Sequence, residues 1–391
     1  MPGWHEATQK HRETGAIQTV GIVQEQHPDR TRLFMQWQRM DWPVLVDALN
    51  LLAVEVVPIT LLIDEQGIIR FRGDLESLDA FLALERPASE LTPEFPAPPD
   101  LDQLASTARD PESQRRHADA LFLWGGPSNL DLAIATYSKI LAAKPSHGAT
   151  HFRLGVAHRS RYDSEHRKPD DFQRAVAHWG KALELNPNQY IWRRRIQQYG
   201  PRLDKPYPFY DWVEEARRDI QDRGETPAVL PVEPRGAEIA HPSKSFATSP
   251  TQQATSPDSQ GKIYRDENGY IAAELTLVPA SLAPGAAGRV HAVFRPNEAI
   301  QAHWNNEVDD LTLWIDPPPG WQVDQRQLQV PNPQQAVSSE VRRLELEIRS
   351  PDDFAAPVTL QGYALYYVCE DVRGSCLYRR QDLELEILPK G

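Results

Sequence analysis

The sequence predicts a multidomain protein that has an N-terminal α/β unit, a central α-helical unit and a C-terminal all-β sandwich. Strand-like and helix-like runs alternate over residues 1–88, helical periodicity dominates residues 113–223, and short runs of period two fill residues 263–391. Between them lie a proline-rich linker at 89–112 and a segment at 224–262 rich in Pro, Ser, Thr and Gln. The second linker is expected to be disordered.

Composition argues against several classes of function. The chain has 391 residues and a formal net charge of −13, whereas binding to nucleic acid needs clustered Lys and Arg. No run approaches the roughly 18 apolar residues of a membrane-spanning helix, and the N-terminus lacks the features of a signal peptide. We therefore expect no nucleic-acid partner, no membrane insertion and, for the chain as written, a cytoplasmic location. A start codon placed too late would instead conceal an export signal and a periplasmic location.

The N-terminal unit is expected to alternate strands and helices. A β-branched run predicts a buried strand, a periodic run with Leu33 on its apolar face predicts a helix, and Gly67 supplies the turn of a hairpin. The expected elements, in order, are a strand at 16–24, a helix at 30–42, strands at 56–64 and 68–73, and a helix at 75–84.

This order, with the motifs VPIT at 57–60 and IDEQG at 63–67, resembles the C-terminal three quarters of a thioredoxin-like domain of the redoxin, cytochrome-maturation type. The resemblance covers about residues 1–88. It implies a cis peptide bond before Pro58 and a partner-docking edge formed by Val57, Pro58 and Ile59.

The family's first strand and its Cys-x-x-Cys motif are absent from this truncated unit. The only cysteines of the chain are Cys369 and Cys376, so the N-terminal unit as written has no thiolate for attack on a disulfide. Two explanations stay open. Either the domain is a binding scaffold, or the start codon is placed too late and an upstream segment supplies the strand and the cysteines.

Two helices of the central unit share four positions at one constant offset. The pattern Ala-x-x-x-aromatic-x-x-small with a terminating proline resembles the second helix of tetratricopeptide repeats, and an insertion at 160–171 accounts for the long offset. The resemblance implies a stack of helix hairpins that holds other domains or binds a peptide in its groove. The paired positions are Ala133, Tyr137, Ile140 and Pro145, and Ala175, Trp179, Ala182 and Pro187.

Basic and histidine side chains give weaker signals. Arg193–Arg195 form either a site for an anion or acidic peptide or a solvated helix face. His147 and His151 have the i, i+4 spacing of metal ligands, but no cysteine or acidic ligand is fixed near them, so we expect surface or groove histidines. His303 has the same interpretation. We expect no metal and no cofactor.

The C-terminal unit is expected to be an antiparallel sandwich of immunoglobulin-like type, because runs such as 342–349 alternate apolar and polar residues. Cys369 and Cys376 flank a turn at Gly374-Ser375. The two thiols could therefore face each other across the base of a hairpin at disulfide distance.

This stretch resembles the cysteine hairpin of the immunoglobulin-like N-terminal domain of the periplasmic thiol:disulfide interchange reductases. The resemblance implies that Cys369 and Cys376 exchange electrons with a thioredoxin-like partner. Three interpretations stay open: a structural disulfide, an exchangeable dithiol, or reduced thiols that are idle or bind a soft metal. Arg373 would favour a thiolate, whereas Glu370 and Asp371 would oppose it.

Two hypotheses follow for the whole chain. The first is a thiol:disulfide oxidoreductase in which Cys369 and Cys376 act and the N-terminal unit docks protein partners or is a degenerate redox module. The second is a non-catalytic scaffold for protein–protein interaction with a structural disulfide. The sequence contains no phosphate-binding loop, no His-Glu-x-x-His motif and no Gly-x-Ser-x-Gly motif that would favour other chemistry.

Overall fold

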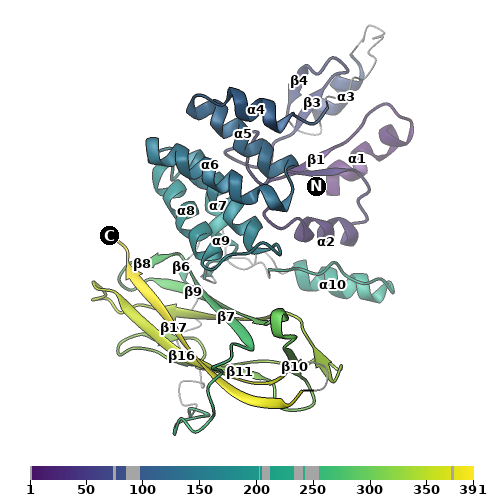
Figure 1. Ribbon diagram of the computed structural model, residues 1–391. Helices are drawn as coiled ribbons and strands as arrows, with labels where there is room; N and C mark the ends of the chain where they lie inside the picture. Colours follow the sequence, from purple (N-terminus) through teal and green to yellow (C-terminus); the bar gives the residue numbers. More distant parts are fainter. Residues whose placement is uncertain are drawn as a thin grey trace. The chain divides into compact units, whose positions relative to one another are not determined.

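The computed structural model describes residues 2–73, 76–84, 97–201, 203–204, 212–232, 241–242, 255–370 and 374–391. A mixed α/β and helical region is followed by a β-rich region, as predicted (Figure 1). The chain divides into two compact units, and each is described by itself. The first contains Met1–His166, Lys181–Arg195 and Tyr210–Glu233, and the second contains Arg167–Gly180, Ile196–Phe209 and Pro234–Gly391.

The N-terminal part consists of short elements that lie within or near the predicted ones. Strands β1 and β2 pair in parallel, and β3 and β4 form an antiparallel hairpin whose turn places Gly67 at a φ of +79°. A positive φ is the conformation that glycine accepts without strain. The elements are α1 (Pro2–Glu13), β1 (Gly21–Val23), α2 (Asp29–Trp37), β2 (Val44–Val46), β3 (Leu61–Ile63), β4 (Ile69–Arg72) and α3 (Glu76–Leu82).

Helix α2 is held by a distant helix of the same unit, α10 (Trp212–Asp222). Leu33 of α2 is fully buried and packs against Val213, Ala216 and Ile220 of α10. Burying a leucine side chain contributes about 1.5–3 kcal/mol, so this contact stabilises both helices. The N-terminal α/β part and these helical residues therefore belong to one compact unit, although the sequence predicts separate domains.

The central helices are α4 (Leu101–Thr107), α5 (Pro111–Trp124), α6 (Leu130–Ala143), α7 (Gly148–Tyr162), α8 (Asp171–Leu185) and α9 (Tyr190–Gln197), with a 3-10 turn at Pro127–Asn129. Helix α5 begins at a capping box in which Asp110 and Ser113 satisfy each other's backbone N–H groups. Because α7 continues through Tyr162, the connection to α8 is shorter than the predicted insertion at 160–171. Of the predicted linker 89–112, the structure describes residues 97–112, which include α4 and the start of α5.

The repeated helical positions are core positions. Each alanine and aromatic residue of the two matching sets is buried, and so are the small or aliphatic residues that follow. In the first set, Tyr137 packs with residues of α5 and α7 in one apolar cluster. The repeat in the sequence thus reflects the burial of the same face in α6 and α8.

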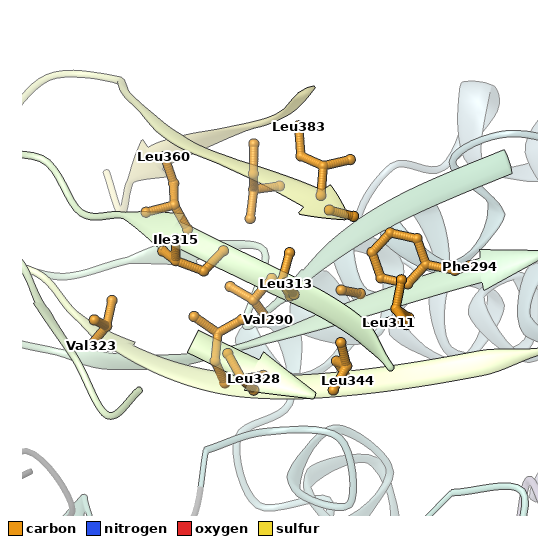
Figure 2. Packing of buried hydrophobic residues seen from close by; sticks show 14 of the residues in the cluster. Val290, Phe294, Leu311, Leu313, Ile315, Val323, Leu328, Leu344, Leu360 and Leu383 are labelled. Carbon is orange, nitrogen blue, oxygen red and sulfur yellow. The ribbon is translucent and has the colours of Figure 1, made fainter. Parts of the chain in front are cut away.

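The β-rich part consists of two sheets that enclose one apolar core (Figure 2). One sheet has the order β12-β15-β9-β7; the other has the order β13-β11-β16-β10-β14, with β17 paired to β16 and β8 paired to β17. All of these pairs are antiparallel except β17–β8. The strands are β7 (Ile271–Val278), β8 (Ser281–Leu282), β9 (Ala287–Pro296), β10 (His303–Asn305), β11 (Leu311–Asp316), β12 (Gln322–Val323), β13 (Gln327–Val330), β14 (Val337–Ser338), β15 (Arg342–Arg349), β16 (Val358–Cys369) and β17 (Cys376–Pro389).

Three short elements are also described. A 3-10 turn lies at Glu298–Ile300, and the two-residue strands β5 (Leu203–Asp204) and β6 (His241–Pro242) pair with each other.

The polar face of β15 differs from the prediction. Leu344, Leu346 and Ile348 enter the core as expected, but Glu347 on the opposite face is buried rather than wet. Residues 167–180 and 196–209 belong to the same compact unit as this sheet, and His291 of the neighbouring β9 contacts the Tyr199 carbonyl oxygen at 2.8 Å. This face of the sheet is therefore covered by other parts of the chain.

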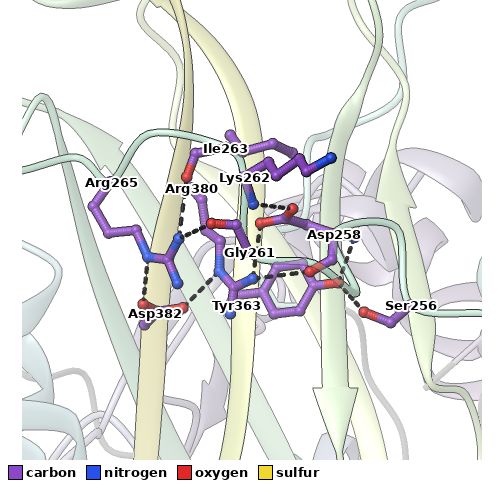
Figure 3. Close-up of polar contacts among 9 residues, drawn as sticks. All are labelled: Ser256, Asp258, Gly261, Lys262, Ile263, Arg265, Tyr363, Arg380 and Asp382. Atoms are coloured by element: carbon purple, nitrogen blue, oxygen red, sulfur yellow. Dashed lines mark hydrogen bonds and ion pairs between the residues drawn. The ribbon is translucent and has the colours of Figure 1, made fainter.

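Part of the predicted disordered linker 224–262 also takes a defined place (Figure 3). Asp258 is buried and accepts a hydrogen bond of 2.9 Å from Arg380 on β17, and its backbone N–H donates to the Tyr363 hydroxyl on β16. Residues 255–262 therefore form a strap on the outer face of the larger sheet, and the prediction of disorder is wrong for them. The β-rich part begins before the expected boundary at residue 263.

Candidate functional site

The two cysteines lie at the end of a long hairpin. Strands β16 and β17 pair over twelve residues, from Val358 opposite Ile387 to Cys369 opposite Cys376. A disulfide joins Cys369 and Cys376, with 3.9 Å between their Cα atoms. The expectation that the two thiols face each other across the base of a hairpin is confirmed.

The two sulfur-bearing residues differ in their access to solvent. Cys369 is only 2% exposed, whereas Cys376 is an exposed residue at the start of β17. An incoming thiolate attacks one sulfur of a disulfide and expels the other. Solvent access therefore makes Cys376 the residue that an external thiol can reach.

Aromatic side chains lie beside the disulfide on the same face of the hairpin. Tyr367 and Tyr378 are directly opposite in register, two pairs along from the cysteines, and their rings stack at a centroid distance of 4.3 Å. Burial, together with the neighbouring Tyr367, raises the pKa of Tyr378 to about 12. Tyr378 is thus neutral at physiological pH, and its ring lies on the same face of the hairpin as the disulfide.

The acidic residue that follows Cys369 is turned away from the sulfur atoms. Glu370 lies next along the strand, so its side chain points to the opposite face, where it accepts a hydrogen bond from the Tyr270 hydroxyl. That hydrogen bond raises the pKa of the Tyr270 hydroxyl. Asp371 and Arg373, which are expected to have opposite effects on the formation of a thiolate, lie outside the described residues.

The tip of the hairpin depends on a glycine. A Cβ atom at Gly374 would collide with the carbonyl oxygen of Glu370. The backbone N–H of Glu370 also donates a hydrogen bond of 3.3 Å to the Ser375 carbonyl oxygen, and these two residues are the chain neighbours of Cys369 and Cys376. Gly374 is therefore required for the close approach of the two strand ends.

The predicted docking residues Val57, Pro58 and Ile59 precede β3 in the N-terminal part. All three are exposed, and the Val57–Pro58 peptide bond is cis. Val57 is 47% exposed and Ile59 is 53% exposed. They belong to the first compact unit and the cysteines to the second.

The docking residues are part of a wider set of exposed apolar side chains. These side chains leave apolar surface in contact with water, and contact with another apolar surface would remove it from water. Sequence patterns missed this surface, because the same β-branched runs predict buried strands. The exposed side chains are Val20, Ile22, Leu45, Val46, Leu51, Leu52, Val56, Val57, Ile59, Leu61, Ile63, Ile68 and Ile69.

The arginine cluster does not form a solvated face. Arg195 is 1% exposed, and its guanidinium donates hydrogen bonds to the Gln26 side chain and to the backbone carbonyls of Gln24 and Ala48. Arg193 bonds the Pro187 carbonyl. The prediction of a solvated face is therefore wrong for Arg195, which joins α9 to the segments that follow β1 and β2.

The paired histidines make hydrogen bonds at the N-terminal end of α7. His147 is the N-cap of α7 and accepts a hydrogen bond from the Thr150 backbone, and burial lowers the pKa of His147. His151 Nε2 lies 2.9 Å from the Pro145 carbonyl oxygen. Across the described ranges, no cluster of three or more His, Cys, Asp or Glu side chains is arranged to hold a metal ion.

Within the part of the chain that the structure covers, no helix is both long and apolar enough to cross a membrane. Comparisons with protein families and with curated proteins found no match. Among solved structures, the bacterial hydrophobin BslA is 12% identical, with a TM-score of 0.17, over 32% of this chain and 97% of its own. AvmM, which catalyses macrocyclization in alchivemycin A biosynthesis, is 14% identical, with a TM-score of 0.18, over 33% of this chain and 96% of its own.

Proposed function

We propose that the protein takes part in thiol–disulfide exchange through Cys369 and Cys376. In this proposal the β-rich part is an immunoglobulin-like sandwich, the central helices are tetratricopeptide-like, and the N-terminal part is a truncated thioredoxin-like module that docks a protein partner at Val57, Pro58 and Ile59. The observation that carries the proposal is the disulfide at the exposed end of the β16–β17 hairpin, with Cys376 open to solvent.

The exchange needs only a dithiol partner and no cofactor. The partner's thiolate attacks the Cys376 sulfur, a mixed disulfide forms, and Cys369 leaves as a thiolate that takes up a proton. The partner's second thiol then attacks the sulfur of the partner's first cysteine in the mixed disulfide, and Cys376 is released as a thiol. Two electrons pass from the partner, which ends as a disulfide, to this protein, which ends as a dithiol.

The test uses the full oxidised chain and reduced thioredoxin as the dithiol protein. Samples are quenched with acid, free thiols are alkylated, and mass spectrometry counts the labels over time. We expect two labels to appear in the folded protein, and we expect a thioredoxin variant that lacks its second cysteine to accumulate a mixed disulfide with Cys376 of the oxidised wild type. A folded protein whose disulfide resists reduced thioredoxin would overturn the proposal and leave a structural disulfide.

A non-catalytic interaction scaffold is the second candidate, and the exposed apolar side chains of residues 20–69 favour it. In a scaffold, the Cys369→Ser/Cys376→Ser variant would lose stability but keep partner binding. Peptides or proteins that bind the full chain can be compared between the wild type, this double variant and Val57→Thr/Ile59→Thr by calorimetry. Binding that is lost in Val57→Thr/Ile59→Thr but kept in the cysteine double variant supports the scaffold. Binding only to the oxidised wild type contradicts it.

A further inference from the structure

A histidine lies in the same cross-strand row as the disulfide. His303 of β10 is directly opposite Cys369 of β16, and Cys369 is directly opposite Cys376 of β17. Residues directly opposite in an antiparallel ladder point to the same face, with Cβ atoms about 4.5–5.5 Å apart. His303 therefore flanks Cys369 on the side away from Cys376.

The neighbouring pair fixes the face on which this row lies. Trp304 is opposite Val368, and both side chains are fully buried in the core between the sheets. Because side chains alternate along a strand, His303 and Cys369 project from the outer face. The imidazole and the sulfur thus lie on the same side of the sheet.

A hydrogen bond indicates which imidazole nitrogen of His303 carries the proton in the neutral ring. His303 Nδ1 lies 3.2 Å from the Gln301 carbonyl oxygen. A carbonyl oxygen can only accept, so Nδ1 carries a proton and Nε2 holds the lone pair of the neutral ring. Among the described residues, Nε2 has no hydrogen-bond partner, so it is available to accept and return a proton.

Because Cys369 is buried, reduction of the disulfide is helped by a group that donates a proton to its sulfur. When the disulfide opens by attack at Cys376, the sulfur of Cys369 leaves as an anion at a residue that is 2% exposed. Charge at a site shielded from water is costly, and a leaving thiolate departs faster when it is stabilised or protonated. Imidazole is the side chain that exchanges protons near neutral pH.

We propose that His303 donates a proton to the Cys369 sulfur as the disulfide is reduced, and accepts it again when the disulfide re-forms. This inference rests on the exchange function proposed above. In the reduction step, the bond between the partner's sulfur and Cys376 forms and the Cys369–Cys376 bond breaks. The electron pair goes to the Cys369 sulfur, and the proton on Nε2 of the imidazolium follows it, which leaves neutral His303.

Among the residues that the structure describes, the charged side chains of Glu340, Arg342 and Glu370 make contacts away from His303. Glu370 accepts from Tyr270 on the opposite face. Glu340 and Arg342 bond each other, the Glu340 carbonyl accepts from the Trp304 indole, and the Arg342 guanidinium lies over the Trp304 ring. The paired residues of β14, Val337 and Ser338, carry no charge.

The test measures the reduction rate of the full oxidised chain by excess dithiothreitol between pH 6 and pH 9. Dithiothreitol is the probe because it needs no docking surface. The variants are His303→Gln and His303→Asn, and His166→Gln, an exposed histidine of the other unit, is the matched control. We expect both His303 variants to react roughly tenfold more slowly than the wild type at pH 6–7, and the ratio to approach one at pH 9, because general acid catalysis by an imidazole fades at alkaline pH.

The ratio separates proton transfer from a structural role. A variant that only loosens the hairpin would change the rate by the same factor at every pH, and that result would overturn the inference, as would rates equal to the wild type. If reduced thioredoxin fails to reduce the wild type while dithiothreitol shows the pH-dependent ratio, the proposed function falls and the role of His303 stands. If thioredoxin reduces the wild type but the rate ratio with dithiothreitol does not depend on pH, only the role proposed for His303 is overturned.

Discussion

The guanidinium of Arg380 lies over the ring of Tyr363, with 3.9 Å between the guanidinium carbon and the ring centroid. The same guanidinium donates to the buried carboxylate of Asp258, which lies on the strap at 255–262. A cation between an aromatic ring and a carboxylate stabilises both contacts. The polar contacts in Figure 3 thus hold a segment with no regular secondary structure on the outer face of the sheet.

This arrangement predicts an acid-sensitive strap. Burial by itself raises the pKa of Asp258, but the hydrogen bonds from Arg380 and from the backbone of Lys262 outweigh it and lower the pKa. The charged form therefore contributes stability that is present above the unfolded-state pKa of about 3.9 and is lost as the pH falls through the lower folded value. Asp258→Asn should cost about 1–3 kcal/mol at pH 7.

Thermal unfolding from pH 7 to pH 2 checks this prediction. The difference in melting temperature between the wild type and Asp258→Asn should be constant down to about pH 4 and shrink below it. Asp353→Asn, at an exposed position of the same unit, is the control and should follow the wild type. A difference that persists unchanged at pH 2 would show that Asp258 acts through its shape and not through its charge.

The unequal exposure of the cysteines predicts unequal reactivity. In Cys369→Ser the remaining thiol at Cys376 is exposed, and in Cys376→Ser the remaining thiol at Cys369 is buried. Iodoacetamide should label the folded Cys369→Ser variant at least about tenfold faster, because thiol reactivity follows access and thiolate content. Equal rates in the folded state, with both variants equally labelled in denaturant, would refute the asymmetry.

Gly374→Ala should disturb the hairpin that carries the disulfide. The added Cβ collides with the Glu370 carbonyl oxygen, so the strand ends must separate, at an expected cost of about 1–3 kcal/mol. The matched control is Gly180→Ala in α8, where an added Cβ meets nothing within 4 Å and alanine favours the helix. If differential scanning calorimetry gives both variants the same melting temperature, the requirement for glycine at 374 is wrong.

The sequence predicts those features of the fold that depend on local order. The alternation at Leu344, Leu346 and Ile348 marks the core face of a strand, and Gly67 marks a turn, because both signals come from neighbouring residues. The burial of Arg195 could not be predicted in this way. Its partners are backbone and side-chain oxygens 147 to 171 residues away in the chain, and no local pattern encodes them.

The candidate site shows the same division. The spacing of the two cysteines around Gly374 predicts a hairpin with facing thiols, whereas the row that adds His303 depends on a strand more than sixty residues earlier. A histidine beside a core tryptophan gives no signal by itself. The strand register, and not the residue type, brings His303 to Cys369.

A buried ion pair in the helical part gives a fourth prediction. Asp119 lies next to the Arg153 guanidinium and accepts a hydrogen bond of 2.6 Å from the Tyr137 hydroxyl. Burial raises the pKa of Asp119, against the opposing effects of Arg153 and Tyr137. Arg153→Met removes the cation and leaves the carboxylate buried, which should cost about 3–5 kcal/mol.

Tyr137→Phe removes one neutral donor from the same carboxylate and should cost less, about 1–2 kcal/mol. The double variant Asp119→Leu/Arg153→Met should recover most of the loss, because replacing both partners of a buried pair leaves no isolated charge. Circular dichroism at 222 nm during urea unfolding measures all three. A double variant less stable than Arg153→Met would contradict this account of the pair.

The exposed apolar side chains of the N-terminal part give the last prediction. Val57 and Ile59 contribute little to folding because they stay about half exposed, so Val57→Thr/Ile59→Thr should change stability by less than about 0.5 kcal/mol. The variant should also bind less of the dye ANS, which reports accessible apolar surface. Leu33→Ala is the buried control from the same part of the chain and should cost about 2–5 kcal/mol.

The two readouts distinguish a surface from a core. If Val57→Thr/Ile59→Thr lowers ANS fluorescence and leaves the urea midpoint unchanged, the side chains form a free apolar surface that a partner can cover. If it unfolds as readily as Leu33→Ala, then Val57 and Ile59 are core residues in solution, and the docking edge proposed for them does not exist.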